Sequence, residues 1–155
     1  MRVLGTTLVH ARSGERSYGI GFELTHRSDR IGSTMELRLA DSVSAPRVAR
    51  CAIHDALTER SAEVREVVAL LVDELVTNAI VHARGEIGLR VEDFPGWIRV
   101  EVSDTARFGP TVRSPSPGDE HGRGMMIVAS LASSWGIVRT PSGKGVWFRL
   151  DLAEQ

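Results

Sequence analysis

Cysteine is almost absent from this chain, because Cys51 is the only one. A single cysteine excludes a disulfide within the chain and any metal site built from clustered cysteines. Long apolar runs are missing too, since no segment reaches the roughly 18 apolar residues that a membrane-spanning helix requires. The first residues, 3–9, are too short and too polar for a signal peptide. We therefore expect a cytoplasmic protein that makes no contact with a membrane.

An excess of charge of either sign is also lacking. The formal net charge is −1 and charged residues make up 25% of the chain, which argues against direct binding to nucleic acid. Lysine is represented by Lys144 alone. The five histidines, at positions 10, 26, 54, 82 and 121, lack the paired spacing of histidine metal sites. The composition thus points away from nucleic-acid binders and histidine-based metalloenzymes.

The apolar pattern divides the chain into an N-terminal extension of uncertain order, 1–34, and one domain, 35–155. Strand-like alternation occupies 36–40, 87–92, 97–103, 137–140 and 145–152. Helical patterns occupy 44–57, where Ser44 is the expected N-cap, and 62–83 and 124–133. This order predicts an α+β fold, a two-layer α/β sandwich whose mixed, mostly antiparallel sheet carries its helices on one face.

Three polar residues, Glu74, Asn78 and His82, recur every fourth position in the strongly apolar segment 62–83. At about 100° per residue, this spacing directs them toward the buried side of the helix. Buried polar groups cost roughly 1–3 kcal/mol each when unpaired, so other side chains or a polar ligand must satisfy them. The plain alternative is that Asn78 and His82 are satisfied core or helix-capping residues.

A stretch without periodicity, 105–121, contains three prolines and has polar features at both ends. Connections longer than about 12–15 residues without structure are usually lids, binding loops or disordered segments. Asp104, just before it, is able to accept hydrogen bonds from an amino group. Gly122 and Gly124, just after it, open a helix whose free N–H groups favour phosphate. The stretch is therefore a candidate lid or binding loop between an acceptor carboxylate and a helix start that favours phosphate.

Together these motifs resemble the GHKL ATP-binding fold, in particular its branch of short bacterial anti-sigma factors and serine kinases. The resemblance runs from about Glu36 to Leu152, and its most specific motif is Glu74-Leu-Val-Thr-Asn78-Ala. Residues 100–104 and 122–128 resemble the two glycine boxes of the family, and 143–148 resemble its closing strand.

The resemblance implies that the ligand is ATP and that Asn78 holds Mg²⁺ through its side-chain oxygen. It also implies that Asp104 accepts a hydrogen bond from the adenine amino group and that Glu74 is the general base. The other residues expected to contact the nucleotide are His82, His121, Gly122, Arg123, Gly124, Met125, Lys144 and Gly145.

Two positions depart from the first glycine box of the family, because Ala106 and Phe108 replace its glycines. The backbone there is less free to approach a nucleotide, so two functions stay open. One is a serine kinase that sequesters a sigma factor and phosphorylates the antagonist of the anti-sigma factor. The other is a nucleotide-dependent binding module that transfers no phosphate. The resemblance is compatible with a homodimer in both cases.

Overall fold

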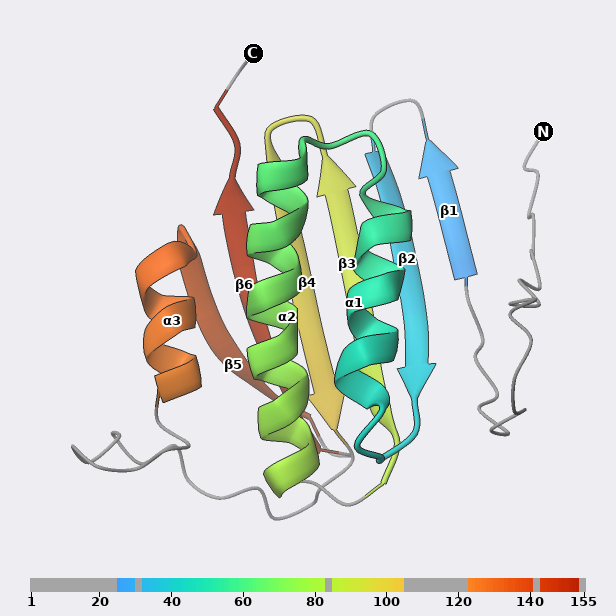
Figure 1. The fold of residues 1–155 in the computed structure, drawn as a ribbon, viewed down its shortest axis with the longest axis vertical. Coiled ribbons are helices and arrows are strands. Elements are labelled where there is room, and N and C mark those ends of the chain that lie inside the picture. The colour runs from blue at the N-terminus through green and yellow to red at the C-terminus, as the bar shows by residue number, and fades with distance from the viewer. Residues whose placement is uncertain (1–24, 30–31, 83–84, 105–122, 141–142, 154–155) are drawn as a thin grey trace.

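The described part of the chain forms two layers, a sheet and a set of helices packed on one of its faces (Figure 1). The computed structural model describes residues 25–29, 32–82, 85–104, 123–140 and 143–153. The helices are α1 (Ala45–Ala56), α2 (Ala62–His82) and α3 (Arg123–Leu131). The strands are β1 (Thr25–Asp29), β2 (Gly32–Leu39), β3 (Ile87–Phe94), β4 (Trp97–Asp104), β5 (Ser134–Thr140) and β6 (Gly143–Asp151).

The described strands lie in the order β1-β2-β3-β4-β6-β5. The predicted two-layer α+β class with helices on one face is confirmed. We expected a mixed, mostly antiparallel sheet, and each neighbouring pair of described strands is in fact antiparallel. The reason is the path of the chain. The helix α3 returns β5 in the same direction as β4, but β6 lies between them and is antiparallel to both.

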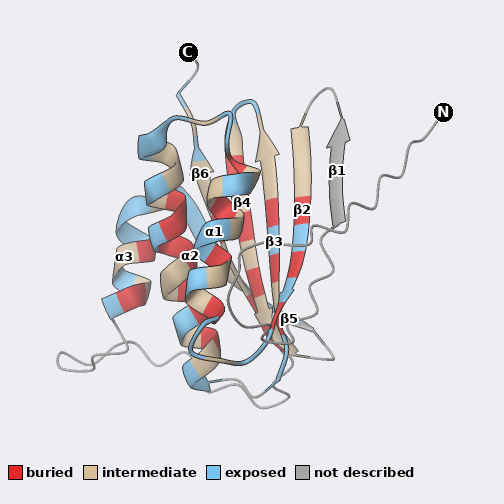
Figure 2. Ribbon diagram, turned by 45° about the vertical axis from the view of Figure 1, so that its right-hand side comes forward, coloured by how far each residue is buried: buried red, intermediate tan, exposed pale blue. Residues whose placement is uncertain are grey.

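Strict alternation in the central strands gives the sheet one apolar face, which the helices cover (Figure 2). Side chains on a strand point to opposite faces in turn, so every second residue is buried. The buried residues of β2, β3 and β4 are Met35, Leu37, Leu39, Ile87, Leu89, Val91, Ile98, Val100, Val102 and Asp104. All except Asp104 are apolar.

The central helix α2 supplies most of the opposing layer. Ser61 precedes it, and the hydroxyl oxygen of Ser61 accepts a hydrogen bond from the N–H of Val64 at 3.3 Å, as expected of an N-cap. The helical repeat of apolar residues at 64, 67, 68, 71, 72, 75, 76 and 79 predicts one buried stripe, and this is confirmed at 68, 71, 72, 75, 76 and 79. Val64 and Val67 are only partly buried, and Ala69 is a buried position that the spacing did not predict.

Two local features differ from the sequence-based expectations. A strand, β1, lies within the segment interpreted as an extension, and it pairs with β2 from Thr25 to Asp29. Its sequence, Thr-His-Arg-Ser-Asp, has no apolar alternation, so only pairing with β2 reveals it. Ser44 precedes α1 as predicted, but its side chain caps no helical N–H and lies 2.8 Å from the hydroxyl of Ser42. Its φ of −86° and ψ of −12° are helical, whereas a side-chain cap needs extended backbone.

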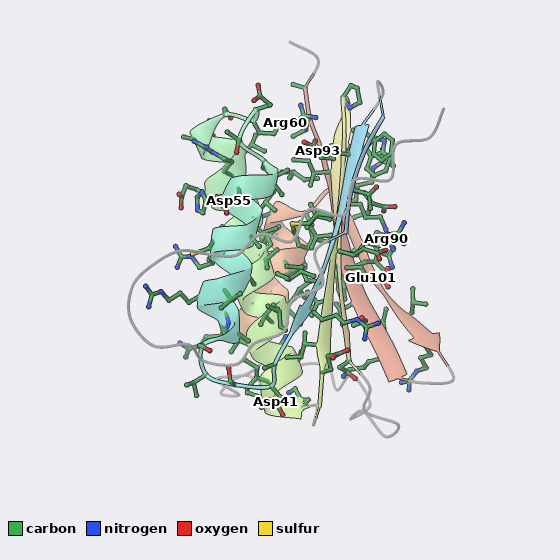
Figure 3. All side chains as sticks on the ribbon, turned by 90° about the vertical axis from the view of Figure 1, so that its right-hand side faces the viewer. Asp41, Asp55, Arg60, Arg90, Asp93 and Glu101 are labelled. Atoms are coloured by element: carbon green, nitrogen blue, oxygen red, sulfur yellow. The ribbon has the colours of Figure 1, made fainter. Side chains whose placement is uncertain are left out.

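An ion pair ties the two layers together at one end of the molecule, between Arg60 and Asp93 (Figure 3). The Nε and Nη2 atoms of Arg60 donate to Oδ1 of Asp93 at 2.9 and 2.7 Å, and Nη2 also donates to the carbonyl of Phe94 at 2.6 Å. The α1–α2 connection is thereby attached to the β3–β4 hairpin.

The other face of the sheet carries charged side chains that pair with one another. Arg90 bonds to Glu36 and Glu92, and Arg99 bonds to Glu92 and Glu101. Figure 3 shows Arg90 and Glu101 on the side of the sheet away from the helices. None of the described helices is both long and apolar enough to span a bilayer.

Candidate functional site

Four elements bring their ends together at the end of the molecule opposite the Arg60–Asp93 pair (Figure 1). They are the C-terminal half of α2, the last residue of β4, the first turn of α3 and the first residues of β6. Contacts of α2 with both α3 and β4 hold this arrangement. Most of the polar residues singled out in the sequence lie on these four segments.

Glu74 lies half-buried on α2, where it meets α3. Burial is the main cause that raises the pKa of the Glu74 carboxyl above its ordinary value, and the negative charge of the neighbouring Asp73 adds to it. A carboxyl with a raised pKa is a better proton acceptor than an ordinary one. Such groups are enriched at functional sites, although structural clusters also produce them.

Gly124 is buried in the first turn of α3, directly against Glu74. A Cβ atom at this position would overlap Oε2 of Glu74 and would lie 3.4 Å from its Cδ and 3.5 Å from its Cβ. Only glycine lets the backbone of α3 come this close to the carboxylate. The structure therefore brings together two motifs whose residues Glu74 and Gly124 are separated by 49 residues in the sequence.

Asp104 ends β4 with its side chain on the helix-covered face, and it is 8% exposed. It is the buried charged residue among those the structure describes. A carboxylate in such a position needs hydrogen-bond donors, because leaving it unpaired would cost several kcal/mol. Its Cα partners across the ladder are Ile87 on β3 and Lys144 on β6.

The two residues predicted to contact the nucleotide from β6, Lys144 and Gly145, lie on opposite faces of the sheet. Lys144 shares the helix-covered face with Asp104. Asp104 lies two residues after the buried Val102, and Lys144 lies four residues before the buried Phe148, so each points to the same face as that buried residue. Gly145 belongs to the other face, where an added Cβ would meet Oε1 of Glu101 at 2.9 Å. Of the two, only Lys144 therefore shares the face on which Asp104 and the helices lie.

Sequence reasoning missed Arg139, which is the Cα partner of Lys144 on β5. Asp104, Lys144 and Arg139 thus form one row across three strands on the same face of the sheet. The sequence predicts strands at 137–140 and 145–152, which are close enough to pair as a hairpin. It does not give the register of that hairpin, and the register is what places Arg139 beside Lys144.

Asn78 follows Glu74 by one turn of α2 and is half-buried, as the helical spacing predicts. His82 is a correction, because we expected it to point inward and it is exposed. It is the last residue of α2, and Val81 beside it is exposed as well, so this end of the helix lies at the surface of the described residues. Arg123 is exposed and Met125 is partly buried against the core. The predicted residues His121 and Gly122, and the proposed lid 105–121, lie outside the described residues.

In a comparison with known protein families, residues 35–150 match the histidine kinase-like ATPase domain. The chain belongs to this family. A comparison with curated proteins finds no match for the chain. Membership supports the GHKL-type fold and implies that the domain binds ATP, in a regulatory role.

The converging end of this histidine kinase-like ATPase domain suits a nucleotide. Asp104 supplies a buried acceptor, and Gly124 is buried in the first turn of α3, where helix N–H groups lack partners within the helix. Lys144 adds a cation on the same face. A hollow elsewhere, on the uncovered face, is lined by residues that include Glu36, Arg90 and Glu101. Its charged groups already pair with one another, so it is the less suitable place for a phosphate.

Proposed function

We propose that the protein is an anti-sigma factor with serine kinase activity, which binds ATP and Mg²⁺ and phosphorylates the antagonist of the anti-sigma factor. The observation that carries this proposal is the position of Glu74. Its carboxylate lies one turn before Asn78 and against the first turn of α3, where a phosphate would be bound. A protein that only binds nucleotide gains nothing from a second negative charge beside the phosphates.

The described residues hold no cluster of three or more His, Cys, Asp or Glu side chains that would bind a metal ion by itself. This suits Mg²⁺, which binds through few protein oxygens, substrate phosphates and retained waters. Asn78 would supply the protein oxygen. The metal would neutralise charge on the phosphates of ATP.

The transfer step needs a proton acceptor beside the incoming hydroxyl. The serine oxygen of the substrate protein attacks the γ-phosphorus, and the bond from this phosphorus to the bridging oxygen of ADP breaks. The proton of the serine passes to the carboxylate of Glu74, and the products are ADP and phosphoserine. Lys144 and Arg139, with the N-terminus of α3, would lower the negative potential that the phosphates experience.

The alternative is a binding module in which ATP changes the surface offered to a sigma factor and no phosphate moves. The replacement of two glycines by Ala106 and Phe108 favours it, because it restricts how the backbone approaches the nucleotide. Both functions expect a sigma factor as partner, and self-association into a homodimer is compatible with both.

The deciding experiment incubates the purified protein with ATP labelled at the γ-phosphate and purified candidate antagonist proteins from the same genome. The kinase proposal expects label on a serine of one antagonist, located by mass spectrometry, and its loss in Asn78→Ala. Tight binding of ATP by calorimetry with no labelled protein would leave the binding module in its place. Failure to bind ATP would contradict both functions.

A further inference from the structure

The contact between Glu74 and Gly124 leaves too little space for a side chain at position 124, and only one atom of Glu74 causes this. The carbon atoms of Glu74 lie at ordinary van der Waals distances from the position of an added Cβ at Gly124, 3.4 Å for Cδ and 3.5 Å for Cβ. Only the carboxylate oxygen Oε2 would overlap it. A side chain at position 124 would therefore conflict with the end of Glu74 and not with the backbone of α2.

The helix α3 itself has little freedom to move away. Val128, one turn after Gly124, is fully buried in the core, and Met125 and Ile127 pack against that core. Just after the helix, the N–H of Ser133 donates to the carbonyl of Arg149 on β6 at 2.8 Å, which attaches this end to the sheet. An added methyl group at position 124 would thus be accommodated by rotation of the Glu74 carboxylate, because this flexible end is easier to move than a packed helix.

We propose that Gly124 is a positioning residue, whose missing side chain keeps the carboxylate of Glu74 directed toward the phosphoryl acceptor. This inference rests on the proposed kinase function. A general base must lie within hydrogen-bond reach of the proton that it takes. Misplacement of a reacting group by about 1 Å costs as much as 10²-fold in rate. The glycine in α3 therefore serves the base on α2, in addition to any contact of its backbone with phosphate.

The partial burial of Glu74 makes the direction of its carboxylate depend more strongly on the missing side chain of Gly124. The same burial that raises the pKa of Glu74 limits the solvent into which its carboxylate could turn. Its sequence neighbour Leu75 is buried in the core, which keeps this part of α2 in place. With alanine at position 124, the added methyl group overlaps the present position of Oε2, so the carboxylate is excluded from that position.

The test compares Gly124→Ala with a matched control, Gly96→Ala. An added Cβ at Gly96 meets nothing within 4 Å, so the control makes the same chemical change without a contact. For Gly124→Ala we expect kcat for phosphoryl transfer to fall by about 10- to 100-fold. We expect KM for ATP and the Kd for ATP to change less than about threefold, and the melting temperature to stay level or rise, because alanine favours a helix over glycine.

Two further measurements separate positioning of Glu74 from other roles. In the Glu74→Gln background, Gly124→Ala should cause no further loss of transfer, since no base remains to be misplaced. The carboxyl ¹³C chemical shift of Glu74, measured by NMR, should change in Gly124→Ala and not in Gly96→Ala. The shift reports on the contact without requiring any activity.

Several results would overturn the inference. An unchanged kcat with an unchanged carboxyl shift would show that the contact is not needed. An equal loss in the Glu74→Gln background, or a large rise in Kd for ATP with kcat unchanged, would assign Gly124 to the phosphates alone. If the wild type transfers no phosphate, the proposed function fails and the positioning role fails with it. A changed shift in Gly124→Ala would then identify the contact as purely structural.

Discussion

Asp104 and Lys144 are Cα partners across the antiparallel ladder of β4 and β6, and both lie on the helix-covered face of the sheet. The next strand continues the row with Arg139. The buried carboxylate that the family resemblance assigns to adenine therefore has a cation on the neighbouring strand. This row lies at the end of the sheet where α2 and α3 also meet, so the proposed contacts to the base and to the phosphates fall in one place.

Replacing Asp104 by asparagine should weaken ATP binding and reduce the preference for ATP over GTP. In the proposed binding mode, the carboxylate accepts a hydrogen bond from the amino group of adenine, whereas guanine offers a carbonyl oxygen there. An asparagine amide is able to rotate and donate to that oxygen. Losing the charged acceptor is expected to cost about 1–3 kcal/mol in ATP binding. Calorimetry with ATP and GTP measures both effects, and Asp151→Asn, at an exposed aspartate near the opposite end of β6, is the control. Equal affinity of the wild type for ATP and GTP would contradict the assignment.

The substitution Glu74→Gln should abolish most phosphoryl transfer and leave ATP binding nearly intact. Glutamine keeps the size of the side chain but accepts no proton, and removal of a general base typically lowers the rate by about 10²–10⁴-fold. The kcat for transfer and the Kd for ATP are measured on the same preparation. Glu59→Gln, at an exposed position outside the site, should leave both values at wild-type level. Full activity in Glu74→Gln would assign the proton to another acceptor.

The same variant should change how stability depends on pH. Burial and the charge of Asp73 raise the pKa of Glu74 in the folded protein, so the folded chain binds this proton more tightly than the unfolded chain. The stabilisation of the folded protein by the bound proton of Glu74 is complete below the unfolded pKa of about 4.3. It is lost as the pH rises through the folded pKa. The stability of Glu74→Gln relative to the wild type should therefore increase as the pH rises through this window. Urea unfolding between about pH 4 and pH 7 measures the difference. A difference that stays constant or decreases would contradict the raised pKa.

The ion pair between Arg60 and Asp93 should contribute more to stability than the exposed pairs on the sheet. The side chains of Arg60 and Asp93 are 24% and 15% exposed, and Arg60 also donates to the carbonyl of Phe94. Arg60→Ala leaves a mostly buried carboxylate without this partner, at an expected cost of about 2–3 kcal/mol. This corresponds to a drop of roughly 4–10 °C in melting temperature. Arg38→Ala, which removes an exposed pair with Glu86, should cost less than about 1 kcal/mol. Calorimetric melting of the two variants checks the order, and equal losses would contradict it.

Local patterns predicted most of the fold because most elements carry their own period. The alternation in 97–103 gives β4, and the buried stripe of 68–79 gives α2, with ends within one or two residues of those observed. The strand β1 was missed because its polar residues have no period, and the antiparallel direction of every described pair depends on β6 lying between β4 and β5. His82 was placed inward because a helical projection takes no account of where the neighbouring layer ends.

The sequence by itself determined which residues are chemically able to act, since Glu74, Asn78, Asp104 and Gly124 stand out as polar or glycine positions within apolar elements. Tertiary structure decided which of them meet. Gly124 lies against Glu74 although 49 residues separate them, and Lys144 shares a face with Asp104 while its neighbour Gly145 does not. The physical reason is that helical and strand periods fix the direction of a side chain only within its own element. Contacts between elements depend on strand order, register and the packing of α2 against α3, which no local period contains.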